Sequence, residues 1–210
     1  MNEETEITEK KVEKKYYDHI SVAKRTSQLA YFVAQHDKIT ILDLVLKEKD
    51  SKKTIIITKS KKSADELYFH LKDNNLKVRA IHGNHKPEIV EESAKIFDDG
   101  EINIIITTDM ILQSLELKNI ELIINYDLPL EPMDYFKRLR LVDEIGESIS
   151  FVSADEDGML STIELLMKIE MPDAILDGFE PTPFVETYKP KKKKPRHKKN
   201  KSKKDYKTSI

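Results

Sequence analysis

The sequence contains no cysteine among its 210 residues. This absence excludes disulfide bonds, thiolate metal sites and cysteine nucleophiles. No run of about 18 apolar residues occurs, so no segment is expected to span a membrane. The first residues, MNEETEITEKKVEKK, have no apolar stretch of the kind that a secretory signal needs. We therefore expect a cytoplasmic protein without membrane contact.

Several motifs of nucleotide and hydrolase chemistry are also absent. Glycine is scarce, at 5 residues, and there is no GxxxxGK[ST] loop to hold a triphosphate. No GxGxxG motif follows a strand, and no GxSxG nucleophile elbow occurs. His82 and His85 have no Asp, Glu or Cys at ligand spacing, so we expect no metal. The carboxylates of residues 155–157 are interpreted as a helix N-terminus that the helix dipole favours, rather than as a catalytic pair.

The formal net charge of -2 hides an uneven distribution. Residues 189–210 contain eleven Lys, one Arg and one Asp, a net charge of +11, whereas the other 188 residues carry 24 basic and 37 acidic side chains. Such dense like charge cannot be buried, so we expect residues 183–210 to form a disordered Lys-rich tail. The tail is interpreted as an arm that binds phosphates of RNA or DNA. The alternatives are a solubilising terminus and a segment that folds back on the acidic body.

Short apolar runs alternate with amphipathic stretches through the body of the chain. Runs that are apolar on both faces indicate buried strands of a parallel sheet. Alternating strands and helices indicate an α/β fold with helices on both faces of that sheet. The predicted strands are 54–57, 78–81, 104–107, 122–125 and 148–152, with 31–33 as a candidate edge strand, and the predicted helices are 38–47, 63–74, 87–98, 133–141 and 155–169. Residues 1–20 are predicted to be a lead-in, and residues 21–182 the folded domain.

Two helices have clear boundary signals. Ser60 or Ser63 is placed to cap the helix predicted from residue 63. Pro87 stands in the first turn of the next helix, and Gly100 follows it as a stop signal. The apolar period of that helix predicts that its buried side chains are Ile89, Val90, Ala94 and Phe97.

Several segments follow one another in a characteristic order: TIIITKSKKSADEL, VRAIHG, KIFDDGEINIIITTD, IELIINYDLP, DYFKRL and GESISFV, which span about residues 20–180. This ordered set resembles the second RecA-like domain of DEAD-box RNA helicases. MPDAILDGFEPTP resembles the end of the RhlE-like branch. The resemblance implies a RecA-like fold, and it implies that the first domain, which carries the P-loop, the DEAD carboxylates and the adenine-recognising Gln, is missing.

The resemblance also implies an RNA-facing edge. The segment that ends in Thr58, Ser60 and Lys61 matches a motif that touches the RNA backbone, and Gly83 and Thr108 match two further RNA-side positions. The family has a Gln and an Arg where this chain has Pro87 and Val90, so part of the pattern is lost. Together with the tail, the expected RNA-binding residues are Thr58, Ser60, Lys61, Gly83, Thr108, Lys191, Lys192, Lys193, Lys194, Arg196, Lys198 and Lys199.

The positions that face the nucleotide in the family are degenerate here. Glu116 replaces an Asp, Arg138 is retained, and Leu141 and Glu144 replace the two arginines that face the γ-phosphate. An arginine finger contributes about 10³ to 10⁵ in rate. We therefore expect no ATP cofactor, no catalytic residue and no hydrolysis by this chain alone.

These observations predict a non-catalytic protein that binds RNA through backbone contacts and the tail. One alternative is a protein-interaction module that docks on another helicase or on a ribonucleoprotein assembly. A second alternative is the C-terminal half of an ATP-dependent RNA helicase that acts with a separate first domain.

Overall fold

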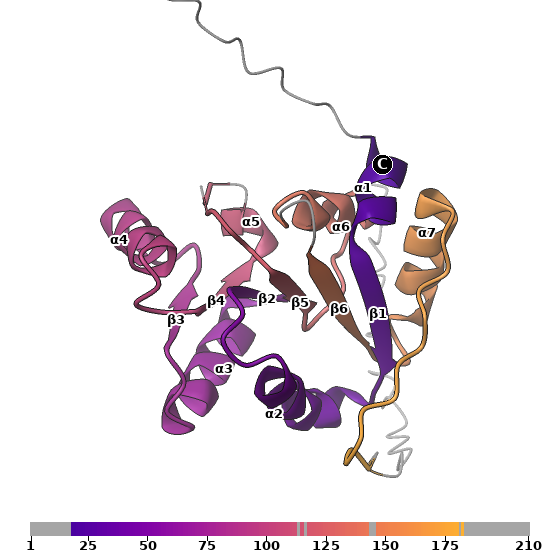
Figure 1. Ribbon diagram of the computed structural model, residues 1–210, viewed down its shortest axis with the longest axis horizontal. Helices are drawn as coiled ribbons and strands as arrows, with labels where there is room; N and C mark the ends of the chain where they lie inside the picture. The colour runs from indigo at the N-terminus through magenta and orange to yellow at the C-terminus, as the bar shows by residue number, and fades with distance from the viewer. Residues whose placement is uncertain (1–17, 113, 116, 143–145, 181, 183–210) are drawn as a thin grey trace, which may run out of the picture.

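A six-stranded, fully parallel sheet forms the centre of the molecule (Figure 1). The computed structural model describes residues 18–112, 114–115, 117–142, 146–180 and 182. The strand order is β1-β6-β5-β2-β4-β3, so β2 lies near the middle, between β5 and β4. The strands are β1 (Ser27–Phe32), β2 (Thr54–Thr58), β3 (Val78–Ile81), β4 (Ile104–Thr108), β5 (Leu122–Asn125) and β6 (Glu147–Val152).

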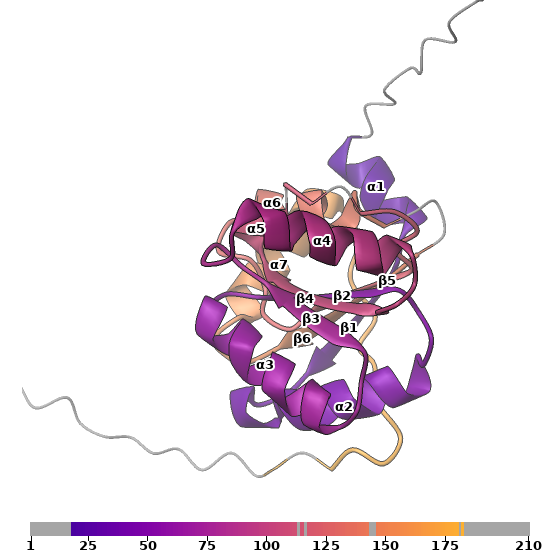
Figure 2. The ribbon, with the colours of Figure 1, turned by 90° about the vertical axis from the view of Figure 1, so that its left-hand side faces the viewer.

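Helices cover both faces of the sheet (Figures 1 and 2). On one face, α2 and α3 bury apolar side chains against alternate strand residues such as Ile56 and Ile106. On the other face, α1, α6 and α7 pack over β1 and β6, while α4 and α5 pack over Ile55 and Ile105. The helices are α1 (His19–Arg25), α2 (Lys38–Glu48), α3 (Lys61–Asp73), α4 (Pro87–Asp98), α5 (Asp109–Leu112), α6 (Pro132–Leu139) and α7 (Asp157–Met167), with a 3-10 turn at Gln35–Asp37.

The predicted α/β fold is confirmed. β2, β4 and β5 are buried along their whole length, as their continuous apolar runs predict. The edge strand is longer and earlier than predicted, because β1 spans Ser27–Phe32 and alternates between exposed and buried residues. α1 has no counterpart among the predicted helices, although Asp18 caps it by accepting a hydrogen bond from the Ser21 amide at 2.9 Å.

The boundaries of α3 and α4 agree with their signals, but the buried face of α4 differs from the prediction. Ser60 caps α3 by accepting from the Ser63 amide at 3.0 Å. In α4 only Ser93 and Phe97 are buried, and Ile89 is 38% exposed. α4 packs over the β3 side of the sheet (Figure 2) and makes few contacts with the strands. The periodic apolar pattern of this helix therefore predicted more buried residues than the structure has.

The last described segment runs back beside β1. The Ala30 amide donates to Pro172, and the Ala174 amide donates to Ala30, which covers part of this edge of the sheet. At its end, Thr182 is held by Asp37: its amide lies 2.8 Å from Oδ2 and its hydroxyl 2.5 Å from Oδ1. Within the described ranges, no helix has the length and apolar character that a membrane span requires.

Candidate nucleic-acid interface

A cleft lies at the carboxyl edge of the sheet, where β2 and β4 end and the loop after β3 begins. Its volume is about 440 Å³. In parallel α/β folds, ligands bind at this edge because the loops after the strands converge there. We call it the carboxyl-edge cleft, and its lining residues are Thr58, Lys59, Ser60, Lys61, Gly83, Thr108, Asp109, Met110, Leu130 and Asp134. All five RNA-facing body residues predicted from the sequence are therefore brought together.

Three polar side chains at the cleft are placed to donate hydrogen bonds. Lys61 is the first residue of α3, and its Nζ donates to Oδ1 of Asn84 at 2.7 Å, which links the β2–α3 and β3–α4 loops. Ser60 is exposed, and it adds its hydroxyl at the same helix N-terminus. The Thr108 hydroxyl forms no hydrogen bond with any residue that the structure describes. A helix N-terminus with a Lys and hydroxyl groups beside it favours anions.

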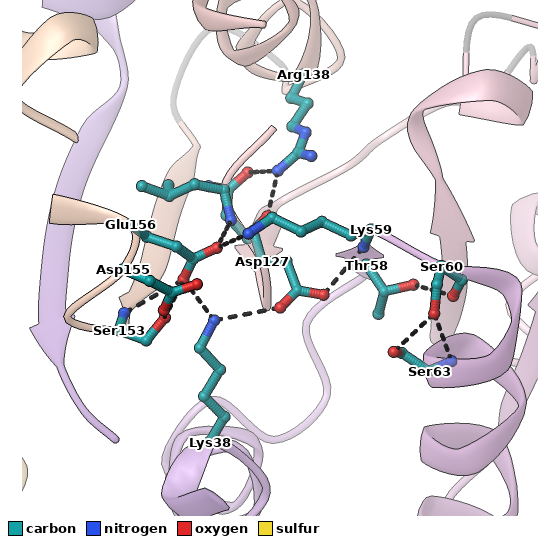
Figure 3. A network of polar contacts seen from close by, with 12 residues as sticks. Lys38, Thr58, Lys59, Ser60, Ser63, Asp127, Arg138, Ser153, Asp155 and Glu156 are labelled. Carbon is teal, nitrogen blue, oxygen red and sulfur yellow. Dashed lines mark hydrogen bonds and ion pairs between the residues drawn. The ribbon is translucent and has the colours of Figure 1, made fainter. Parts of the chain in front are cut away.

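The polar groups of Thr58 and Lys59 are bonded within the domain. Thr58 is fully buried, and its hydroxyl donates to the Ser60 carbonyl at 3.0 Å (Figure 3). Lys59 Nζ lies 2.5 Å from Oε1 of Glu156, so its charge is neutralised within the domain. The Thr58 hydroxyl therefore shapes the β2–α3 loop, and Lys61 is the lysine of this cleft without a carboxylate partner among the described residues.

A buried ionic network underlies this wall of the cleft (Figure 3). Lys38, the first residue of α2, is fully buried, and its Nζ lies 2.7 Å from Glu156 Oε2 and 3.2 Å from Asp127 Oδ1. Asp127 Oδ2 accepts from the Lys59 amide, and Glu156 Oε1 accepts from the Leu128 amide. The network ties together the chain segments that follow β1, β2, β5 and β6, and so fixes the position of the β2–α3 loop.

The charge state of Glu156 follows from these contacts. Burial acts to raise the pKa of this carboxyl, but hydrogen bonds from Lys38 and Lys59 outweigh burial and lower the pKa from 4.5 to about 2. Glu156 is therefore ionised at neutral pH. The sequence-based interpretation of residues 155–157 as a helix start is correct, since α7 begins at Asp157, but it missed that Glu156 points inward to bind lysines.

Arg138 lies beneath the opposite side of the cleft and is fully buried. Its guanidinium binds both carboxylate oxygens of Asp109 at 2.7 Å, and it also donates to Asn125 Oδ1 and to the Asp127 carbonyl. Four of its five N–H groups are thereby occupied. Arg138 fixes the start of α5, next to Thr108.

Two of the positions that the resemblance places beside the nucleotide, Arg138 and Leu141, are among the described residues. Arg138 is committed to Asp109, and Leu141 packs against the apolar cluster around Ile123. Neither side chain presents a cation to a γ-phosphate. Glu116 and Glu144 lie outside the described residues.

The two histidines of the β3–α4 loop form a structural contact. His82 Nε2 lies 2.9 Å from Asp65 Oδ1 of α3, and the rings of His82 and His85 are 4.2 Å apart. The nearby Asp65 comes from a different element, which the sequence spacing did not reveal. Across the described part of the chain, no group of three or more His, Cys, Asp or Glu side chains is arranged to hold a metal ion.

The predicted RNA-binding cations of the tail lie outside the described residues. The tail begins next to Thr182, which Asp37 holds. The Thr182 hydroxyl lowers the pKa of the Asp37 carboxyl by donating a hydrogen bond to it. Because Asp37 immediately precedes Lys38, Thr182 lies near the buried network.

The residues that sequence reasoning missed are those of the network and the apolar side chains of the cleft. Lys38 and Glu156 are 118 positions apart, and no local pattern links them. The one signal for Asp127 was its place directly after a buried strand, where the NYDLP segment resembles the helicase family.

Comparisons with known proteins identify the family. The helicase conserved C-terminal domain matches residues 37–140. The ATP-dependent RNA helicase DbpA of Bacillus subtilis is 32% identical over 148 residues, which are 67% of this chain and 31% of that protein. The chain spans about a quarter to a third of the length of the curated relatives it matches.

Two structures of Saccharomyces cerevisiae Dbp5 variants share this fold. One, bound to RNA and ADP BeF3, has a TM-score of 0.70 and 25% identity, covering 77% of this chain and 44% of the other. The other is the C-terminal domain bound to a Gle1 variant and IP6, with a TM-score of 0.65 and 26% identity, covering 72% of this chain and 91% of the other. The RhlE-like assignment stays a prediction. The chain described here carries the helicase conserved C-terminal domain of the DEAD-box RNA helicases, with the RecA-like fold of their second domain.

Proposed function

We propose that this chain is a non-catalytic RNA-binding protein that holds the sugar–phosphate backbone at the carboxyl-edge cleft, with additional binding by the Lys-rich tail. The observation that carries the proposal is the convergence of Ser60, Lys61, Gly83 and Thr108 on one cleft at the sheet edge. Dbp5, whose fold is similar, was solved in complex with RNA, which supports a nucleic-acid ligand.

The chemistry of the cleft suits a phosphate. Lys61 supplies a cation, Thr108 and Ser60 supply hydroxyls, and the N-terminus of α3 supplies the positive end of a helix dipole. Gly83 is exposed, and it adds no side chain that would narrow the cleft. Contacts of this kind carry no base information, so binding is largely independent of sequence.

The charged side chains around the cleft carry a small excess of positive charge. Lys59 is paired with Glu156, Asp109 with Arg138 and Asp134 with Lys137. Lys61 contacts only the neutral amide of Asn84 among the described residues. One cation is therefore available for an incoming phosphate. The acidic character of residues 1–188 opposes this single cation, so residues 189–210, with a net charge of +11, contribute much of the long-range attraction.

We propose that the chain is non-catalytic because of its missing P-loop and the state of two residues at the positions that face the nucleotide in the family. The chain has no P-loop, Arg138 is buried in an ion pair, and Leu141 stands where the family has an arginine. A cytoplasmic location also remains part of this proposal.

A protein-interaction module is the second candidate. It is favoured by the exposed apolar side chains Met110, Leu130 and Met133 and by the similar Dbp5 domain bound to a Gle1 variant. A helicase half that acts with a separate first domain is the third candidate, since the matched relatives are about three times longer than the aligned region.

RNA binding by the whole chain tests the proposal. Fluorescence anisotropy with a labelled single-stranded RNA is measured for the native chain and for the double variant Lys61→Ala, Thr108→Ala. We expect about tenfold weaker binding by the variant and a salt slope that falls by about 0.7, because one phosphate contact is lost.

Lys62→Ala is the matched control. Lys62 is exposed and adjacent to Lys61, but it pairs with Glu66 and does not line the cleft. We expect its effect on affinity to be small. Equal effects of the control and of the double variant would show that the cleft does not contribute. If the native chain binds no RNA, the protein-interaction module would be favoured.

A further inference from the structure

The carboxyl-edge cleft has an apolar wall that phosphate binding does not use. Met110 of α5 is 78% exposed and Leu130 of the β5–α6 loop is 75% exposed, and both line the cleft. The Met110 sulfur lies over Gly83, 3.5 Å from the position that a Cβ of residue 83 would occupy. Two large, exposed apolar side chains from separate elements therefore line the same cleft as Ser60 and Lys61.

This arrangement matches the two-sided chemistry of a nucleotide unit. A nucleotide has an anionic phosphate at one end and a ribose and base with large apolar surfaces at the other. In the cleft, the helix N-terminus and Lys61 suit the phosphate, whereas Met110 and Leu130 suit the ribose and base. A volume of about 440 Å³ is within the range of small-ligand sites.

We infer that Met110 and Leu130 form an apolar wall that packs against the ribose and base of the nucleotide whose phosphate is held at Lys61. This inference rests on the proposed function and adds a nucleobase contact to it. The occupant is a single-stranded nucleic acid, because Lys61, which has no carboxylate partner among the described residues, and the hydroxyl of Thr108 line the same cleft. Two exposed side chains are also a small surface beside the roughly 800 Å² per partner of a stable protein interface.

The wall adds affinity with little base preference. Methionine has three rotatable bonds and a polarisable sulfur that makes favourable contacts with aromatic rings, so it adapts to any base. Every base presents a flat π-face, which makes such contacts tolerant of sequence. The wall neutralises no phosphate, and its contribution is therefore independent of salt.

The test compares three ligands on the whole chain: a single-stranded oligouridylate, a strand of the same length without bases, and inorganic polyphosphate. In the variant Met110→Ala, Leu130→Ala, we expect affinity for oligouridylate to fall about three- to tenfold while its salt slope stays unchanged. Affinity for polyphosphate is expected to stay as in the native chain, and the abasic strand is expected to show a smaller loss than oligouridylate.

Leu165→Ala serves as the matched control, because Leu165 of α7 is 77% exposed and does not line the cleft. We expect this control to leave all three affinities unchanged. An unchanged oligouridylate affinity in the double variant would overturn the apolar wall, as would an equal loss for polyphosphate, which would indicate a distorted cleft. These outcomes differ from failure of the proposed function, in which Lys61→Ala changes neither affinity nor salt slope, or the native chain binds no RNA.

Discussion

Lys38 Nζ lies 2.7 Å from Glu156 Oε2, and both side chains are almost completely removed from solvent. The pair joins the start of α2 to the N-terminus of α7, and through Asp127 and Lys59 it reaches the loop that carries Ser60 and Lys61. Removing two charges from water is costly, so such a pair is stable only when every charge has a partner. The geometry of the carboxyl-edge cleft therefore depends on this ionic network.

Replacement of Lys38 by methionine tests this dependence. Lys38→Met keeps the length of the side chain but leaves Asp127 without a side-chain cation and Glu156 with Lys59 alone. We expect a loss of about 3–5 kcal/mol in the free energy of unfolding, because one partner of a buried pair is removed. Urea unfolding followed by circular dichroism gives the measurement.

Lys47→Met is the control for this change, since Lys47 lies on the same helix and is exposed. We expect its effect to stay within about 0.5 kcal/mol, as for most surface substitutions. Similar losses in the two variants would show that the network does not stabilise the fold.

The lowered pKa of Glu156 predicts a pH dependence of stability. Its native pKa is about 2 and its ordinary value is 4.5, so the unfolded chain binds the proton more tightly. The stabilisation is therefore fully present above about pH 4.5 and is lost as the pH falls towards 2. The difference of about 2.5 units corresponds to about 3 kcal/mol at neutral pH.

The variant Glu156→Gln isolates this contribution from those of other carboxyls. Free energies of unfolding are measured for both proteins between pH 7 and pH 3. We expect the native chain to be more stable at pH 7 and the difference to shrink as the pH falls below 4.5. A difference that is constant across this range would contradict the assigned pKa.

The sequence predicts much of the fold because its strongest signals are local. β2, β4 and β5 are runs of β-branched residues that are buried on both faces, and continuous apolar runs indicate such strands directly. β1 was only partly predicted because an edge strand alternates between buried and exposed residues. The burial of Ile89 was overestimated, since periodicity gives a face of a helix but not the area that covers it.

The candidate site was predictable only in part. The resemblance to a helicase domain placed Ser60, Lys61 and Thr108 near one another, because each follows a strand of the same sheet. The ion pair between Lys59 and Glu156 was not predictable, since the two residues lie 97 positions apart. Similarly, nothing in the sequence near Arg138 shows that Asp109 would bind its guanidinium.

The chain alone is expected neither to bind ATP measurably nor to hydrolyse it. The sequence has no P-loop, and the retained Arg138 is held by Asp109 inside the protein. An arginine finger contributes about 10³ to 10⁵ in rate, and Leu141 supplies no charge in its place. A phosphate-release assay with homogeneous protein, with and without RNA, gives the measurement. RNA-stimulated release well above the blank would contradict this prediction.

The Lys-rich tail is expected to provide most of the RNA affinity. Residues 189–210 carry eleven Lys and one Arg, and each phosphate that they neutralise on a single strand contributes about -0.7 to the slope of log affinity against log salt. Thr182, the last described residue, is held by Asp37 beside Lys38.

Removal of residues 189–210 is therefore expected to weaken RNA binding by at least about tenfold and to flatten the salt dependence. Affinity is measured by anisotropy at several salt concentrations, with circular dichroism to show that the body is unchanged. A chain in which the same twelve cations are replaced by glutamine separates the effect of charge from that of length. If the shortened chain binds as tightly as the whole chain at low salt, the cleft rather than the tail anchors the RNA. If only the glutamine variant keeps full affinity, the tail acts through contacts other than charge.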